Sequence, residues 1–321
     1  MNVTDWLCDG DAAIRWQTFR DLAGASPAQV NAARARVANE GLAAEILAQQ
    51  QSDGAWRCPG EPAWLTTLFT LQLLRATGVD PADPKIVHAM QLAETNLRWN
   101  IHEDCWDIRS PQFGGNDFFE GEEEPCINGG VLAFGSYFGH PNEKLARRLL
   151  SEQLSDGGWN CEAPKNSSRS SYHTTICVLE GLLEYENATR LANAPDSTLE
   201  VAAARHRAEN YLLERALFRR RSTGDPASAE FLEFAFPPRY HYDILRALDY
   251  FRASGAPADP RMSDAVAIIE RKQQADGRWL LDRSYNEALT VTTGEEVGQP
   301  SRWNTLRALR VLQWFAENRR E

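Results

Sequence analysis

Apolar residues recur at three- and four-residue spacing along most of the chain, which is typical of helices with one buried face. One set of such stretches lies near residues 27–50, 83–98, 142–154, 199–216 and 260–274. A second set begins around Trp16, Trp64, Cys126, His173, His241 and Trp303. The sequence therefore predicts an all-α protein in which two kinds of helix alternate.

Three copies of one motif, Q-x-x-D-G-x-W, follow helices of the first set. They lie at Gln50–Trp56, Gln153–Trp159 and Gln273–Trp279. The Asp-Gly pair supplies a turn, because Asp accepts backbone N–H groups and Gly adopts the positive φ that ends a helix. We expect the Trp to pack against the neighbouring repeat and the Gln to hydrogen-bond backbone groups, so that the motif joins adjacent units.

Six helices of the second set, alternating with about five of the first, predict an α/α toroid in which inner helices surround a cavity and outer helices cover the seams. The chain has 321 residues, 43% of them hydrophobic, and ten Trp, enough to bury one large core. No Pro-, Gly- or Ser-rich stretch marks a linker. We expect a single domain, residues 1–321.

The net charge of −11 argues against nucleic acid or an anionic membrane as a partner, because both recruit basic patches. The first residues lack a basic segment followed by an apolar run, and no eighteen consecutive residues are apolar. Six cysteines in a chain of this length do not form a disulfide scaffold. These features predict a cytoplasmic protein with a small-molecule substrate and no membrane insertion.

The Q-x-x-D-G-x-W motifs and the alternating helices resemble the prenyltransferase and squalene oxidase repeats of triterpene cyclases and protein prenyltransferase β subunits. The resemblance covers nearly the whole chain through its repeats and implies the toroid fold. A finer match is Tyr172-His173-Thr174, which resembles the Tyr-His-Thr helix that supplies a zinc-ligating histidine in protein prenyltransferases. That family also takes zinc ligands from an Asp-x-Cys motif, and this chain has Glu124-Pro125-Cys126 in the corresponding place. The resemblance thus implies Cys126 and His173 as ligands and Glu124 as a third candidate.

The internal repeat points to a metal independently. Aligning the helices of the second set places Trp16, Trp64, Cys126, His173, His241 and Trp303 in one column. Three consecutive helices then present Cys126, His173 and His241 at one level, and zinc accepts three such ligands plus a water or a fourth protein ligand. The alternative is a set of polar residues at helix starts, hydrogen-bonded to their neighbours.

The segment before Cys126 is strongly acidic, with Asp117, Glu120, Glu122, Glu123 and Glu124. Protein prenyltransferases carry basic residues there to hold an isoprenoid diphosphate, so we expect no diphosphate substrate here. The D-x-D-D motif of class II triterpene cyclases is also absent. The segment fits either a solvated loop or a lid.

These features predict an enzyme with a zinc site formed by Cys126, His173 and His241, acting on a small organic substrate by Lewis-acid or metal-hydroxide chemistry. Glu124, Asp243, Tyr172 and Tyr240 are candidate catalytic residues, because each lies beside a candidate ligand in sequence and could orient it or move a proton. One alternative is a metal-free terpenoid cyclase-like enzyme, with Trp16, Trp64 and Trp303 binding substrate and stabilising cations by cation–π attraction. Another is a non-catalytic toroid that binds a peptide or a lipid.

Overall fold

The protein is all-α, as the sequence predicts. The computed structural model describes residues 2–99, 115–163, 165–191 and 196–318. The α-helices of these residues are α1 (Val3–Cys8), α2 (Ala12–Asp21), α3 (Pro27–Arg34), α4 (Gly41–Ala48), α5 (Ala63–Thr77), α6 (Pro84–Asn96), α7 (Pro125–Tyr137), α8 (Glu143–Ser151), α9 (Tyr172–Leu191), α10 (Asp196–Leu213), α11 (Ile244–Ala253), α12 (Ser263–Lys272) and α13 (Arg302–Asn318). Short 3-10 turns η2 (Phe118–Glu120), η3 (Ala229–Leu232) and η4 (Pro260–Met262) lie between them. Strands β1 (Trp279–Leu280) and β2 (Pro300–Ser301) form one antiparallel pair, with Trp279 opposite Ser301.

Short polar side chains set where many of the helices begin. Asp11 accepts the backbone N–H of Ala13 at the start of α2, and Asn142 accepts that of Leu145 at the start of α8, at 3.0 Å. Such caps satisfy N–H groups that have no partner within the helix. The residues at the caps therefore determine locally where these helices begin.

The chain forms two compact units, each built from separated segments. Unit 1 comprises Met1–Ala43, Leu212–Asn286 and Thr292–Glu321, and unit 2 comprises Ala44–Tyr211 and Glu287–Val291. Because both units recruit segments distant in sequence, they are not consecutive domains. The expected single domain stays a prediction.

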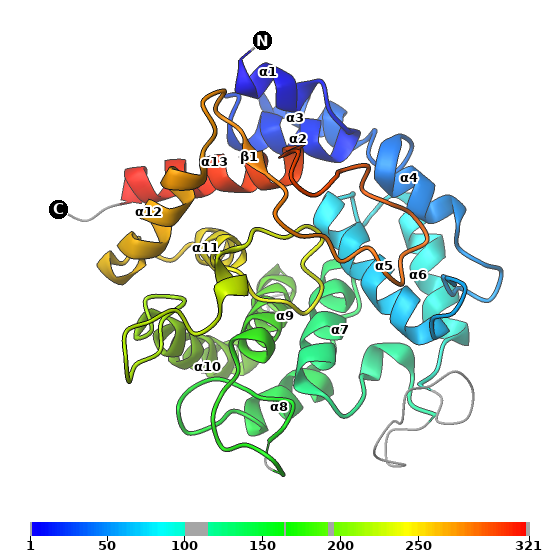
Figure 1. Ribbon diagram of the computed structural model, residues 1–321. Helices are drawn as coiled ribbons and strands as arrows, with labels where there is room; N and C mark the ends of the chain where they lie inside the picture. Colours follow the sequence, from blue (N-terminus) through cyan, green and yellow to red (C-terminus); the bar gives the residue numbers. More distant parts are fainter. Residues whose placement is uncertain (1, 100–114, 164, 192–195, 319–321) are drawn as a thin grey trace. The chain divides into compact units, whose positions relative to one another are not determined.

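In unit 2, helices α5, α7 and α9 are successive neighbours, and α8 packs against both α7 and α9 (Figure 1). The contact between α7 and α9 is very close because both helices carry glycine there. A Cβ at Gly129 would lie 2.5 Å from the carbonyl oxygen of Cys177. Three inner-type helices with an outer-type helix over one seam match the predicted alternation.

Unit 1 repeats this arrangement. Helix α13 packs against α2 and α11, and α12 contacts both α11 and α13 (Figure 1). Helices α1 and α3 pack against α2. Each unit thus shows inner-type helices joined side by side and covered by an outer-type helix.

The three Q-x-x-D-G-x-W motifs place their tryptophans alike, and their Gln side chains donate to backbone carbonyls as predicted. Trp56, Trp159 and Trp279 are fully buried. Each indole N–H donates to the last or next-to-last turn of the preceding outer helix, to the carbonyl oxygens of Ile46, Leu149 and Ile269 respectively. The side-chain amides of Gln50 and Gln153 each donate to two backbone carbonyls, one in the motif's own turn and one in the next outer helix, at Ala89 or Ala204.

A polar residue near the start of each of five inner helices accepts a backbone N–H from the segment that precedes the helix. We call these the first-turn acceptors; they are Thr67, Asn128, Thr175, Asp243 and Thr305. Thr67, Thr175 and Thr305 accept the N–H groups of the three motif tryptophans, at 3.0–3.1 Å. Asn128 accepts the N–H of Glu122 at 2.8 Å, and Asp243 accepts that of Ala235 at 3.3 Å.

The first-turn acceptors correct the alignment of the inner helices at one position. Cys126, His173, His241 and Trp303 each lie two residues before an acceptor, so their equivalence is supported. In α5 the acceptor is Thr67, and the residue two positions earlier is Leu65. Leu65, not Trp64, therefore occupies the position equivalent to His173.

Candidate metal centre

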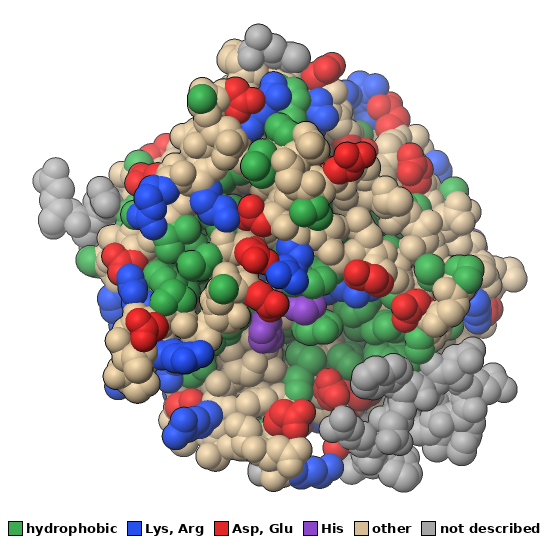
Figure 2. Space-filling view, viewed as in Figure 1, with side chains coloured by type: hydrophobic (Ala, Val, Ile, Leu, Met, Phe, Trp, Pro, Cys, Tyr) green, Lys and Arg blue, Asp and Glu red, His purple; other side chains and the backbone are tan. Residues whose placement is uncertain are grey.

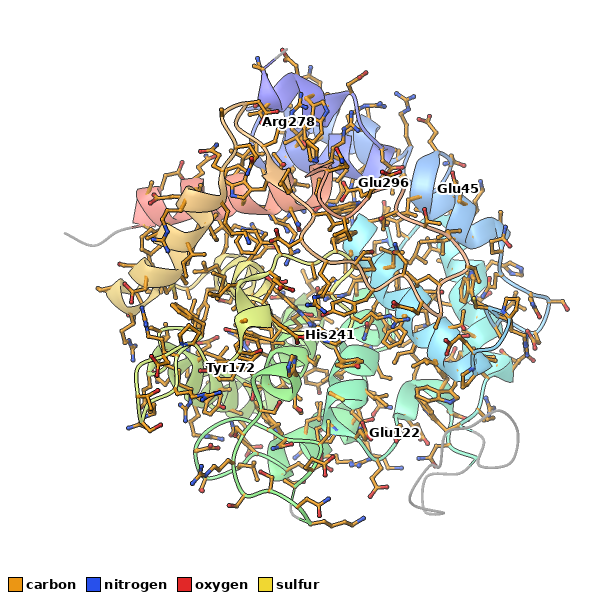
Figure 3. The ribbon with its side chains drawn as sticks, in the orientation of Figure 1. Glu45, Glu122, Tyr172, His241, Arg278 and Glu296 are labelled. Atoms are coloured by element: carbon orange, nitrogen blue, oxygen red, sulfur yellow. The ribbon has the colours of Figure 1, made fainter. Side chains whose placement is uncertain are left out.

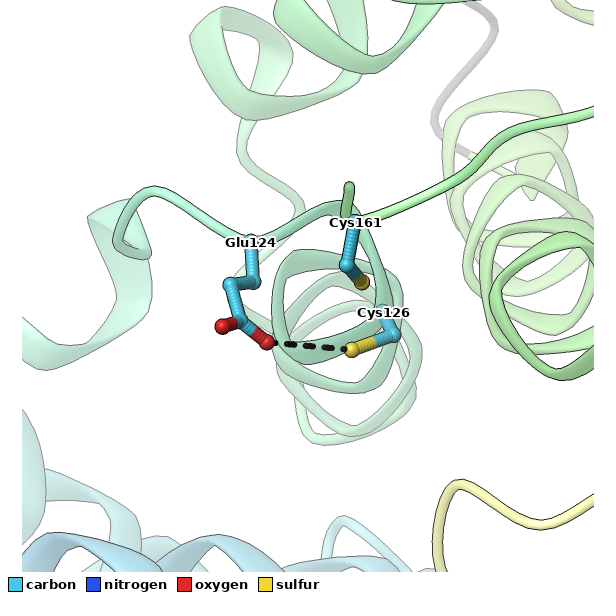
Figure 4. Close-up of side chains that lie close together, drawn as sticks. All are labelled: Glu124, Cys126 and Cys161. Atoms are coloured by element: carbon cyan, nitrogen blue, oxygen red, sulfur yellow. Dashed lines mark hydrogen bonds between the residues drawn. The ribbon is translucent and has the colours of Figure 1, made fainter. Parts of the chain in front are cut away.

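Glu124, Cys126 and Cys161 bring their ligand atoms together in unit 2. One oxygen and two sulfur atoms lie within 4.8 Å of one another, and this is the one group of three or more such side chains found among the described residues. The Cys126 thiol lies 3.7 Å from Oε2 of Glu124, and Cys161 approaches from a separate segment (Figure 4). Two thiols and a carboxylate at this spacing are a donor set that suits zinc.

Local sequence explains how Glu124 and Cys126 are placed. Glu124 is the N-cap residue of α7, and Pro125 occupies the first helical position, where its missing N–H costs nothing. Asn128, one turn on, binds both the N–H and the carbonyl oxygen of Glu122. These bonds hold the acidic segment against the start of the helix, so both candidate ligands lie in one well-anchored turn.

Cys161 is positioned by the second Q-x-x-D-G-x-W motif. It follows the buried Trp159 by two residues, and the backbone of Trp159 is bound to Thr175 in α9. The Cys161 sulfur lies 3.4 Å from the hydroxyl oxygen of Thr174 in the same first turn of α9. The motif thereby places the Cys161 thiol, which follows α8 in sequence, beside the start of α7.

Arg148 of α8 ties the acidic segment down from the other side. Its guanidinium donates to the carbonyl oxygens of Glu122 and Glu123, and its Nε donates to Glu152 at 2.8 Å. The Glu122 carboxylate turns back to accept the N–H of Glu124. Burial raises the pKa of Glu122 to about 7, although hydrogen bonds from the backbone of Glu124 and Glu123 oppose the shift. Glu122, labelled in Figure 3, thus lies buried directly before the site.

The two thiols differ in acidity because they share a hydrogen bond. The pKa of Cys126 is raised well above its ordinary value. The main cause is the hydrogen bond that Cys126 donates to Cys161, and burial is the next. The bond that Cys161 accepts from Cys126 lowers the pKa of Cys161; burial opposes this change, and the Thr174 hydroxyl adds to it. The two pKa values are therefore shifted in opposite directions.

The group of Glu124, Cys126 and Cys161 does not include the two histidines predicted as ligands. His173 is the second residue of α9 and half-buried, next to the Thr174 that contacts Cys161, and its role as a ligand stays a prediction. His241 belongs to unit 1, where its ring lies between Tyr240 and Tyr285. The ring centroids of His241 and Tyr285 are 3.7 Å apart and their planes differ by 3°. Its convergence with Cys126 also stays a prediction.

The remaining catalytic candidates have structural contacts. Asp243 is buried at the N-cap of α11 and accepts the N–H groups of Arg246 and Ala235. Burial raises the pKa of Asp243, although the nearby Arg307 guanidinium opposes this. Tyr172 is buried at the start of α9 with its ring edge-on to Tyr211 (Figure 3). Tyr240 is 45% exposed and stacks on His241.

The three predicted substrate-binding tryptophans are mostly covered by protein. Trp16 is 4% exposed and lies beneath the guanidinium of Arg20, 4.6 Å from the ring centroid. Trp303, also 4% exposed, stacks on Phe236 at 4.2 Å. Trp64 is less covered and lies 5.5 Å from the Trp99 ring. A role for any of them in substrate binding stays a prediction.

The sequence pointed to Glu124 and Cys126 but not to Cys161 as their partner. The sequence indicates Cys161 only through its place just after the motif tryptophan Trp159. The structure shows that hydrogen bonds anchor this tryptophan. His102, Asp104, Cys105 and Asp107, which also carry ligand-type side chains, lie outside the described residues. Acidic and basic side chains are interspersed over the face in Figure 2, and apolar ones gather beside α5 and α7.

Comparisons with known proteins give similarity in structure only. No family model and no curated protein matches the chain. A protein from Actinoplanes matches with a TM-score of 0.44 and 16% identity over 95% of this chain and 89% of that chain. The type II terpene cyclase MstE from Scytonema, in complex with its product merosterolic acid A, matches with a TM-score of 0.46 and 17% identity over 98% and 86% of the two chains. None of the described helices is both long and apolar enough to cross a membrane.

Proposed function

We propose that this chain is a zinc-dependent enzyme for a small organic substrate, with the metal held by Glu124, Cys126 and Cys161. The observation that supports the proposal is the spacing of their ligand atoms, all within 4.8 Å of one another. Three protein ligands leave a fourth position for substrate, as in catalytic zinc sites. Bound there, zinc would supply Lewis-acid polarisation of a substrate oxygen.

The chain's own residues would prepare the site for that chemistry. Cys126 and Cys161 offer two sulfur atoms, Asn128 and Arg148 hold the segment that carries Glu124, and Thr174 contacts the sulfur of Cys161. The carboxylates of Glu120 and Glu123 lie close to Lys144 and Lys165, but the segment retains a negative balance. This charge favours a neutral or cationic substrate over a diphosphate.

His173 decides between two forms of the site. If its imidazole is a fourth ligand, the metal is closed off and structural; if not, the fourth position is open. Substituting His173→Ala should leave zinc bound in the second case and weaken it strongly in the first. His241→Ala tests in the same way whether His241 is a ligand.

The test is metal analysis of protein purified without a His-tag or added metal. We expect about one zinc per chain, lost in Cys126→Ser and in Cys161→Ser but retained in Cys58→Ser, whose thiol lies outside the group. Cobalt(II) substitution adds a second reading, because each thiolate ligand contributes charge-transfer absorption. Zinc-free protein that also fails to bind cobalt would overturn the proposal and favour the metal-free cyclase-like or ligand-binding alternatives.

A further inference from the structure

Cys126 and Cys161 are also placed to react with each other. Their sulfur atoms lie within 4.8 Å, and both residues are free thiols. They come from segments 35 positions apart, since 161 − 126 = 35. Each residue is partly exposed. A disulfide requires the two sulfurs to close to about 2.05 Å.

Cys126 and Cys161 differ in how they are held. Cys126 is fixed in the first turn of α7, whose neighbour Asn128 is fully buried. Cys161 lies in a turn between the anchored Trp159 and the start of α9, outside any helix. The residue following Cys161, Glu162, accepts backbone N–H groups from Asn166 and Ser167 within that loop. The approach of the two sulfurs would therefore involve the turn that carries Cys161 and no helix on that side.

We propose that Cys126 and Cys161 form an oxidation site at which peroxide produces a reversible disulfide. One sulfur attacks a peroxide oxygen, the O–O bond breaks, and a sulfenic acid and water form. The second sulfur then attacks the sulfenic sulfur and expels another water as the S–S bond forms. In total the two thiols lose two protons and two electrons, and hydrogen peroxide is reduced to two waters.

The oxidation has a consequence for the metal that rests on the proposed function. A disulfide has no thiolate to offer, so oxidation would remove both sulfur ligands together and leave Glu124 alone. Conversely, bound zinc would occupy both sulfurs and slow the reaction with peroxide. The site would then be metal-bound under reducing conditions and metal-free after oxidation.

The experiment treats the full chain, stripped of metal with a chelator, with a small excess of hydrogen peroxide. Digestion without reductant and mass spectrometry should show the peptides carrying Cys126 and Cys161 linked, two hydrogens lighter than their sum, and dithiothreitol should separate them. In Cys126→Ser the sulfenic acid of Cys161 should accumulate and react with dimedone. Cys58→Ser, the matched control, should form the same link as the unmodified chain.

The outcomes separate the two proposals. If Cys126 and Cys161 remain thiols, oxidise separately, or link to other cysteines, the oxidation site is wrong whether or not zinc binds. If the disulfide forms equally fast with and without added zinc and no zinc is bound, the oxidation site stands and the zinc function fails. Protection by zinc, with release of zinc on stronger oxidation, supports both.

Discussion

Gly181 of α9 packs directly against the backbone of Gly129 of α7: a Cβ at Gly181 would lie 2.4 Å from the Gly129 carbonyl oxygen. Real Cβ atoms do not approach so closely, and the obstacle is backbone, not a flexible side chain. The two helices can therefore be neighbours only while both positions lack a side chain.

Substituting Gly181→Ala should consequently destabilise the protein. The alanine gains up to about 1 kcal/mol in helix propensity, but overpacking against a rigid backbone costs about 1–3 kcal/mol. We expect a net loss in the free energy of unfolding, measured by urea denaturation. Asn187→Ala, at an exposed position of the same helix, should change stability by less than about 0.5 kcal/mol. Equal effects of both substitutions would contradict the close contact.

Thr66 and Thr67 are adjacent, buried, and chemically identical, yet removing their hydroxyls should have opposite results. Thr67 accepts the N–H of Trp56, so Thr67→Val leaves a buried donor unpaired and should cost about 1–3 kcal/mol. The Thr66 hydroxyl has no hydrogen-bond partner, so Thr66→Val should be neutral or stabilising. Thermal denaturation of the two variants in parallel tests the first-turn acceptor directly; a larger loss from Thr66→Val would reject it.

Trp159 should be one of the most costly residues to truncate. It is fully buried, and its indole N–H donates to the carbonyl of Leu149 at 2.7 Å. Trp159→Ala should reduce the free energy of unfolding by about 3–5 kcal/mol. Trp159→Phe keeps most of the volume but leaves that carbonyl without its donor. Its free energy of unfolding should lie between those of Trp159→Ala and the unmodified chain. A loss under about 1 kcal/mol for Trp159→Ala would show that the motif does not join the helices.

Asp249 should govern part of the stability at acid pH. Burial alone would raise the pKa of Asp249, but the guanidinium groups of Arg310, Arg252 and Arg307 outweigh it and hold the pKa well below its usual range. A carboxyl whose pKa is lowered on folding stabilises the folded state above its unfolded pKa of about 3.9 and loses that contribution as the pH falls toward the folded value. The stability advantage of the unmodified chain over Asp249→Asn should therefore be full near neutral pH and shrink below about pH 4.

Denaturation curves at several pH values measure this difference. Asp225→Asn, in an exposed loop, is the control and should change stability by less than about 0.5 kcal/mol throughout. A difference between the unmodified chain and Asp249→Asn that grows in acid would have the wrong sign and would exclude the ion pairs as its source.

The helices were predictable from the sequence because their apolar spacing and their caps are local. The outer helix expected at residues 142–154 begins after its Asn142 cap and runs from Glu143 to Ser151. The position of Trp64 was harder to predict, because its identity matches Trp16 and Trp303. A tertiary hydrogen bond from Trp56 to Thr67 decides the register instead, and no local pattern encodes that bond.

The same difference between local sequence and tertiary packing applies to the candidate site. Glu124 and Cys126 are neighbours in sequence, so their proximity could be anticipated from a helix start. Cys161 meets them only because Trp159 anchors its loop between two helices, which is a property of packing. Asp243 was expected to be catalytic from its place near His241, and that role stays a prediction. Its carboxylate takes the position that Thr175 and Thr305 hold in other inner helices, which only the packing reveals.

The division of the chain between the two units has a consequence for synthesis on the ribosome. Unit 2 is drawn almost entirely from one continuous stretch, Ala44–Tyr211, so most of it can fold while later residues are still being made. Unit 1 cannot, because α2 packs against α13, which is synthesised some 280 residues after it. The part of α2 that packs against α13 must therefore stay exposed, or be held by a chaperone, until α13 has been synthesised.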